Sequence, residues 1–200
     1  MKDEATPAAA KDSARILDTS ALKALAHPLR VQIYDILSQR GPQTASTLAE
    51  LTGESSGATS YHLRALARHD LIREVAGRGT GRERWWERFP GGVTLTNPDA
   101  LKTPSGKAAT HVVMTEFLTR RHQQLMRYVT ESIQTPEEDK ENSLISTATL
   151  HMTYEQTIEF IEQIQAVIDS AADKYRDQQG EGVSPISVRA DIIPLPEEGK

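Results

Sequence analysis

The sequence of 200 residues contains no cysteine, which excludes a disulfide framework, a thiolate metal site and a thiol nucleophile. It also lacks any run that approaches the roughly 18 apolar residues needed to span a membrane. The N-terminal segment MKDEATPAAAKDSARILD has no apolar core of the kind found in secretory signals. These absences predict a soluble cytoplasmic protein without a membrane partner.

The usual catalytic constellations are missing as well. The sequence has no glycine-rich phosphate loop after a strand, no nucleophile elbow and no carboxylate pair in a recognisable setting. Its acidic run Glu137, Glu138 and Asp139 falls in a predicted loop, where such side chains are normally solvated. We therefore expect that the protein is not an enzyme and that it uses no cofactor.

Positive charge is scarce overall but is concentrated in one part of the chain. The formal net charge is -5, yet residues 20–92 hold ten Lys and Arg against seven Asp and Glu, a net charge of +3. All but one of these ten basic residues are arginine. A basic part beside an acidic part is typical of a protein whose basic part meets a polyanion, although an unevenly charged solvated surface also explains the pattern.

Four consecutive helices are predicted in the first third of the chain. Ser20 can cap the first helix, Pro28 opens the second and Thr44 caps the third. The second and third helices end at Gly41 and Gly53, respectively. The short link after Gly53 leads directly into the fourth helix.

The fourth helix has an unusual beginning. Its sequence, SSGATSYHLRALARHDLI, opens with small and hydroxylated residues, which are poor helix formers, and places its leucines later. A slim end rich in hydrogen-bonding groups suits the major groove of DNA, which is about 12 Å wide. The positive end of the helix dipole favours phosphate at the same place. The candidate DNA contacts are Thr44 before the third helix and Ser55, Ser56, Gly57, Thr59, Ser60, Tyr61 and Arg64 in the fourth.

A strand–loop–strand pattern follows this helix. LIREVAGRGTGRERWWERFP alternates around Ile72, Val75 and Trp85, and its middle, GRGTGR, is too rich in glycine for a helix or a strand. We predict a hairpin with a basic tip, in which Trp85 and Trp86 form the core and the edge. Next to a DNA-binding helix, we expect the arginines of this hairpin to contact phosphates or the minor groove; they are Arg78, Arg82 and Arg84.

This order of elements is that of a winged helix-turn-helix, whose second motif helix enters the major groove. The stretch LKALAHPLRVQIYDIL…TASTLAELTGESSGATSYHLRALARHDLI resembles the ArsR-like winged-helix transcriptional regulators through LAHPLR, LAE and SYHLRAL…LI. The resemblance covers about residues 20–90. It implies a homodimer that binds double-stranded DNA at a palindromic operator, usually represses and is often released by a ligand. The alternative is an effector- or protein-binding module whose winged helix no longer binds DNA.

The histidines depart from the pattern of the family's metal sensors, which bind metal through cysteines or through Asp and His on a C-terminal helix. His111 and His122 share a helix face, but Ala109 and Leu125 occupy the positions where further ligands are expected. Two imidazoles alone make a weak site, so we expect no metal. We expect His62 to pack structurally behind its helix.

Composition and turn residues divide the chain into four segments. A flexible N-terminal arm (1–18) precedes the winged domain (19–92), and a linker (93–104) leads to a C-terminal dimerisation or effector domain (105–200). The C-terminal domain is expected to be helical or α+β. The predicted fold class is therefore mainly α with a small β component.

The C-terminal domain is predicted to hold two long helices and two strands. An apolar stripe from Met114 to Val129 runs longer than a small domain needs, which suits a helix shared between subunits of a homodimer. The segments 144–152 and 184–196 are predicted strands on either side of a helix that begins at Thr153.

A hydrophobic small-molecule effector is one expected ligand of this C-terminal domain. A cavity between its helices would be lined by apolar side chains suited to such a molecule. The alternative is a fully packed core with no cavity. The candidate lining residues are Met114, Phe117, Ile158 and Ile161.

Overall fold

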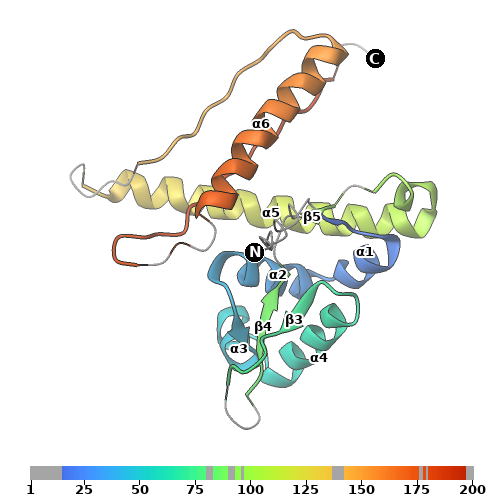
Figure 1. Ribbon diagram of the computed structural model, residues 1–200, viewed down its shortest axis with the longest axis vertical. Coiled ribbons are helices and arrows are strands. Elements are labelled where there is room, and N and C mark those ends of the chain that lie inside the picture. Colours follow the sequence, from blue (N-terminus) through green and yellow to red (C-terminus); the bar gives the residue numbers. More distant parts are fainter. Residues whose placement is uncertain are drawn as a thin grey trace, which may run out of the picture. The chain divides into compact units, whose positions relative to one another are not determined.

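Figure 1 shows the computed structural model of the protein, which describes residues 15–79, 83–89, 93–95, 97–136, 142–175, 178 and 180–196. Contacts divide the chain into two compact units, Met1–Lys140 and Glu141–Lys200. Helices dominate the described residues and the strands are short, which confirms a mainly α fold with a small β component. None of the described helices is long and apolar enough to cross a membrane.

The first unit contains most of the secondary structure. Its helices are α1 (Thr19–Leu25), α2 (Pro28–Arg40), α3 (Ala45–Thr52), α4 (Ser56–Ala67) and α5 (Pro104–Gln134), with a 3-10 turn at Ala100–Lys102. Its strands are β1 (Arg15–Ile16), β2 (Gln43–Thr44), β3 (Ile72–Glu74), β4 (Trp85–Arg88) and β5 (Val93–Thr94).

Local capping residues set most helix ends as the sequence predicts. Pro28 occupies the first turn of α2, and Thr44 caps α3 by accepting a hydrogen bond from the backbone N–H of Thr47 at 3.1 Å. The prediction that Ser20 caps α1 was wrong. Asp18 is the cap, because its carboxylate accepts the N–H of Ala21 at 2.7 Å.

Three strands form an antiparallel sheet in the order β2–β4–β3. β3 and β4 are the predicted hairpin, with Ile72 opposite Arg88 and Glu74 opposite Trp86. β2 extends the hairpin by pairing Thr44 with Trp85, so the hairpin is anchored to the residues that start α3. A separate parallel pair joins β1 and β5.

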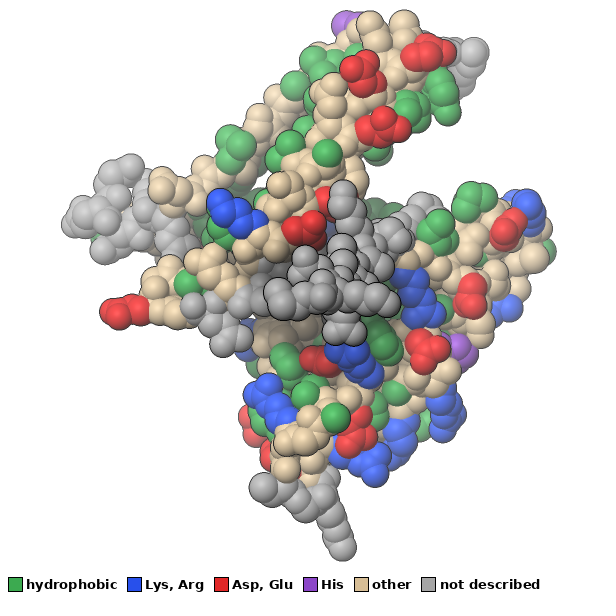
Figure 2. Space-filling model, viewed as in Figure 1, with side chains coloured by type: hydrophobic (Ala, Val, Ile, Leu, Met, Phe, Trp, Pro, Cys, Tyr) green, Lys and Arg blue, Asp and Glu red, His purple; other side chains and the backbone are tan. Residues whose placement is uncertain are grey.

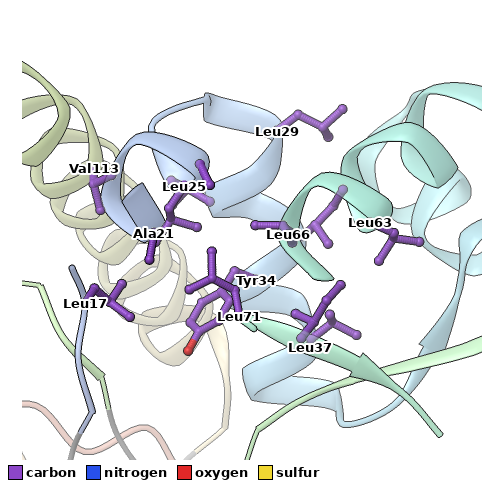
Figure 3. Close-up of a cluster of buried hydrophobic side chains, with 14 of the residues drawn as sticks. Leu17, Ala21, Leu25, Leu29, Tyr34, Leu37, Leu63, Leu66, Leu71 and Val113 are labelled. Carbon is purple, nitrogen blue, oxygen red and sulfur yellow. The ribbon is translucent and has the colours of Figure 1, made fainter. Parts of the chain in front are cut away.

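One hydrophobic core connects all five helices of the first unit (Figure 3). The leucines of α4, Leu63 and Leu66, are fully buried and point toward side chains of α2, including Leu37. Burial of a leucine side chain contributes about 1.5–3 kcal/mol, so these two contacts hold α4 firmly on the unit. The largest fully buried apolar side chains of the described residues are Leu17, Leu22, Leu25, Val31, Ile33, Leu48, Leu63, Leu66, Ile72 and Val113.

The first unit extends well beyond residues 19–92. Leu17, in the segment expected to be a flexible arm, is fully buried, and its carbonyl accepts the side-chain N–H of Asn97 at 2.9 Å. Ala109 and Val113 on α5 are also buried in this core. The segment 93–104 and the start of α5 therefore pack with the winged domain, and the contacts divide the chain after Lys140 instead of before residue 105.

The second unit contains α6 (Tyr154–Tyr175), which begins one residue after the predicted start at Thr153. Thr153 and Gln156 form a reciprocal cap, with hydrogen bonds of 2.9 and 3.3 Å. The strands predicted at 144–152 and 184–196 are absent from these described segments. Alternating apolar residues form a strand only when a partner satisfies the backbone, and neither described segment pairs with another.

Candidate nucleic-acid interface

The candidate interface is built on α3 and α4, which form a helix–turn–helix. Gly53 ends α3 in the left-handed region, with φ 74° and ψ 18°, and its N–H reaches the carbonyl of Ala49. Ser55 then caps α4, because its hydroxyl oxygen accepts the N–H of Ala58 at 3.1 Å. Three residues therefore reverse the chain, and the N-terminus of α4 is left exposed.

Two predicted DNA contacts, Thr44 and Thr59, are buried and need correction. The Thr59 side chain is 0% exposed, and its hydroxyl donates to the carbonyl of Ala45 at 2.8 Å. Thr44 is 6% exposed and is occupied as the cap of α3. Both residues fix α3 and α4 in place. The spacing could have shown this for Thr59, because it precedes Leu63 and Leu66 by four and seven residues on the same helix face.

The outward face of α4 is polar and partly basic. Ser56, Gly57 and Arg64 are exposed, and Tyr61 is 62% exposed. Ser60 is half-buried. Figure 2 shows blue Lys and Arg side chains gathered over the region of the first unit where Figure 1 places α4. These exposed side chains can offer hydrogen bonds and positive charge to a polyanion.

Arg68 is an exposed residue of this face that the sequence analysis overlooked. It lies one helical turn after Arg64, at the C-cap of α4, and its side chain is exposed. The four-residue spacing from Arg64 was the available indication, since residues four apart share a helix face. Arg64 and Arg68 together make the C-terminal half of this face the more basic half.

The hairpin of β3 and β4 is the wing. The guanidinium of Arg78 lies 3.8 Å from the ring centroid of Trp85, a cation–π contact that holds the arginine against the hairpin. Arg84 is 65% exposed and forms a 3.5 Å ion pair with Glu74. Trp86 is buried in the core and Trp85 is half-buried, which is the reverse of the predicted order of core and edge. Arg82 lies outside the described residues.

The shape of the wing tip depends on Gly79. Its φ of 99° is rarely adopted by residues with a side chain, and a Cβ there would lie 2.5 Å from the carbonyl oxygen of Glu83. Glycine therefore allows the backbone at Gly79 to come close to that of Glu83 in the connection between β3 and β4.

His62, on α4, packs against the ring of His27, as expected of a structural histidine. Its ring lies 4.6 Å from that of His27, which precedes α2, with the two planes tilted by 44°. Burial is the main cause that lowers the pKa of His62, and the neighbouring His27 and Arg30 lower it further. His111 and His122 are exposed on α5. Within the described part of the chain, no group of three or more His, Cys, Asp and Glu is placed to hold a metal ion.

The four candidate effector residues fall in two units. Met114 and Phe117 are half-buried on α5 in the first unit, where the ring of Phe117 meets Tyr34 edge-on at 6.4 Å. Ile158 and Ile161 lie on α6 in the second unit and are each 39% exposed. The effector pocket stays a prediction.

The short α3, the turn, α4 and the three-stranded sheet define a winged helix-turn-helix domain. Residues 25–75 match the family model described as "Helix-turn-helix domain". This match confirms a helix-turn-helix domain within the stretch that resembles the ArsR-like regulators, and it supports a DNA-binding transcriptional regulator as the class of protein.

Seven chains among solved structures match this chain. One is described as "Crystal structure of Possible transcriptional regulator for arsenical resistance". It is 25% identical, the match covers 54% of this chain and 94% of that chain, and the TM-score is 0.31. No curated protein matches the chain.

Proposed function

We propose that this protein is a sequence-specific transcriptional regulator that binds a palindromic operator as a homodimer and acts as a repressor. The observation that carries the proposal is the exposed polar face of α4, held on a buried scaffold beside a wing with exposed arginine. A helix-turn-helix presents its second helix to the major groove in this way. A binding role without catalysis is part of the proposal.

The work of binding is divided between α4 and the wing. Ser56, Tyr61 and Arg64 are exposed where base edges would be read, and Gly57 lets the backbone come close. The N-terminus of α4 offers its positive dipole end to a phosphate. Arginines of the wing, among them the exposed Arg84, supply phosphate contacts that position the domain without reading sequence.

α5 is the proposed dimerisation helix. Two half-sites about 34 Å apart require two copies of α4 at a fixed separation. The ion pair between Arg120 and Asp35, at 3.3 Å and with both side chains less than a quarter exposed, fastens α5 to α2. Beyond Val113, α5 exposes Leu118 and Leu125, seven residues apart, which is the repeat of a helix pair.

A hydrophobic small molecule remains the proposed effector. The support is chemical: Met114, Phe117, Ile158 and Ile161 are apolar and none of them is fully buried within its own unit. Such a ligand could shift DNA affinity only by its difference in affinity for the DNA-bound and the DNA-free protein.

A gel-shift titration in increasing salt tests DNA binding. The full chain is mixed with a duplex taken from upstream of its own coding sequence, with a shuffled duplex of equal length as control. We expect tighter binding to the upstream duplex and a linear fall of log K with log salt. No binding to either duplex would favour the alternative, a winged module that does not bind DNA.

Light scattering tests the dimer. We expect Leu118→Glu and Leu125→Glu together to give a monomer, because they place charge in the apolar stripe of α5. Gln123→Glu is the control, since it adds one negative charge, against two in the double variant, at an exposed position on the other side of the helix. A double variant that stays dimeric would rule out α5 as the dimerisation helix. Truncation before α5 is a poorer test, because it would remove Val113 from the core.

A further inference from the structure

The environment of His27 and His62 does not favour a second proton on either imidazole ring. His27 caps α2 through its ring, because Nδ1 accepts the N–H of Leu29 at 3.2 Å. An unprotonated Nδ1 is required for this, so the single proton of a neutral His27 is on Nε2. Protonation of His27 would turn the accepting nitrogen into a donor, and the cap would be lost.

A second proton on the ring of His62 is also unfavourable, but for a different reason. Its Nδ1 is buried and has no hydrogen-bond partner among the described residues. Keeping the single proton on Nε2 avoids burying an unsatisfied donor, so a second proton must go to Nδ1. That would bury a charged donor without an acceptor, which costs several times more than leaving a neutral ring.

The surrounding charges oppose protonation on balance. The titratable and charged groups that bear on His62 are His27 before α2, Arg30 on α2, Glu54 before α4 and the neighbouring Tyr61 on α4. Burial, His27 and Arg30 all lower the pKa of His62, and only the carboxylate of Glu54 raises it. Burial also lowers the pKa of Arg30, whose Nε makes no hydrogen bond within the described structure.

The position of the pair connects protonation to the DNA-binding helix. His62 lies between the exposed Tyr61 and the fully buried Leu63 on α4, and His27 stands at the start of α2. The ring contact of 4.6 Å therefore joins the two helices directly. Two imidazolium rings at that distance, with Arg30 nearby, would repel each other.

We propose that the His27–His62 pair is a proton-sensitive clasp, closed when both rings are neutral, whose protonation in mild acid loosens α4 from α2 and so releases DNA. The DNA part of this inference rests on the proposed function. The clasp itself is a property of the folded first unit and can be tested without DNA.

The expected pH range follows from the direction of the shift. The pKa of His62 is lowered in the folded protein from an ordinary value of 6.5, so the unfolded chain takes up the proton first. The contribution of neutral His62 to the stability of the fold is therefore complete above pH 6.5, and it decreases as the pH falls below this value. While the ring of His62 stays neutral in the fold, the unfolding equilibrium constant rises about tenfold for each pH unit below that point.

Urea unfolding of the full chain between pH 8 and 5.5 is the first test. His62→Phe keeps a flat ring, and His27→Asn keeps a capping acceptor, but neither replacement can be protonated. The wild type should lose stability below pH 6.5 more steeply than the double variant, and His122→Gln, an exposed control, should behave as the wild type does. Parallel curves for the wild type and the double variant would overturn the proposal.

If the variants do not fold, an NMR titration of the histidine resonances in the wild-type protein tests the proposal. A titration midpoint for His62 below 6.5 supports the clasp, and a midpoint at or above 6.5 overturns it. This measurement reports on protonation of the native protein and requires no substitution.

DNA binding at constant ionic strength is the final test. With a fluorescent duplex from upstream of the coding sequence, wild-type affinity should fall about threefold or more from pH 7.5 to pH 6.0, and the double variant should change less. Charge alone predicts the opposite sign, because added protons favour binding to phosphate. A rise in wild-type affinity would refute the release of DNA. No binding at pH 7.5 would refute the proposed function, and the unfolding experiment would still decide the clasp.

Discussion

Removal of the buried hydroxyl of Thr59 tests whether this residue holds α4 in place or contacts DNA. Thr59→Val removes the hydroxyl while keeping the β-branched shape, so packing and helix propensity change little. The shortest hydrogen bond lost is the one to the carbonyl of Ala45, at 2.8 Å, and the same hydroxyl also lies 3.1 and 3.3 Å from the carbonyls of Ser56 and Ser55 within α4. The variant should therefore weaken the attachment of α4 to α3 without altering the exposed face.

The size of the effect follows from what remains at the acceptor. Ala45 is the first residue of α3, and its carbonyl is also placed to accept the helical N–H of Ala49. It is therefore not left without a partner when the hydroxyl of Thr59 is lost. The cost should be close to that of one buried hydrogen bond, about 0.5–1.5 kcal/mol, and should not reach the larger penalty of an unsatisfied buried group.

Urea denaturation followed by tryptophan fluorescence measures this cost, since Trp86 is buried in the same core. The midpoint should fall while the slope stays constant. Tyr61→Phe is the matched control, because it deletes an exposed hydroxyl from the same helix and should change stability by less than about 0.5 kcal/mol. A Thr59→Val protein of unchanged stability that binds DNA poorly would refute the assignment, since the hydroxyl would then act on DNA.

Three further predictions concern the wing, α4 and α5. Replacing Arg78 and Arg84 together with Ala should weaken binding to all duplexes alike and reduce the salt slope in gel shifts; an unchanged slope would remove both residues from the phosphate contacts. Arg64→Ala should cost about 1–3 kcal/mol on a duplex selected from a random pool and much less on unselected DNA, and equal losses would reassign it to phosphate. Gly106→Ala should destabilise the first unit by about 1–3 kcal/mol in urea, because its Cβ would lie 2.0 Å from a carbonyl oxygen of the preceding 3-10 turn. Gly57→Ala is the control, since its Cβ meets nothing closer than 3.8 Å.

Residues 20–90 were predictable because their structure is determined by short-range chemistry. Pro28 can start a helix wherever it stands, and Thr44 needs only the N–H three residues later to cap α3. The leucines of α4 repeat with the helical period, and the wing alternates with the period of a strand. Each of these signals lies within a few residues of the element that it specifies.

The composition of α4 does not show which of its hydroxyls face inward. Thr59 and Ser60 are chemically alike and adjacent, yet one is fully buried and the other half-buried. Composition suggests DNA contact for both. The helical spacing from Leu63 and Leu66 places Thr59 on the buried face, and the packing of α3 against α4 brings the carbonyl of Ala45 beside its hydroxyl.

The extent of the first unit was decided by contacts between residues far apart in the chain. Asn97 binds the carbonyl of Leu17, 80 residues away, and Arg120 binds Asp35, 85 residues away. These contacts attach β5 and α5 to the winged domain, although proline and glycine between residues 93 and 104 are typical of a linker.

By itself, the sequence determined the winged helix-turn-helix, because caps, turns and hydrophobic periods act over a few residues and need no distant partner. Only the tertiary structure decided that the hydroxyl of Thr59 binds the carbonyl of Ala45, that β2 joins the hairpin, and that Val113 on α5 belongs to the first core. The same reason explains the absent strands at 144–152 and 184–196. Alternating residues make a strand possible, but its backbone hydrogen bonds must come from a partner that the local sequence does not specify.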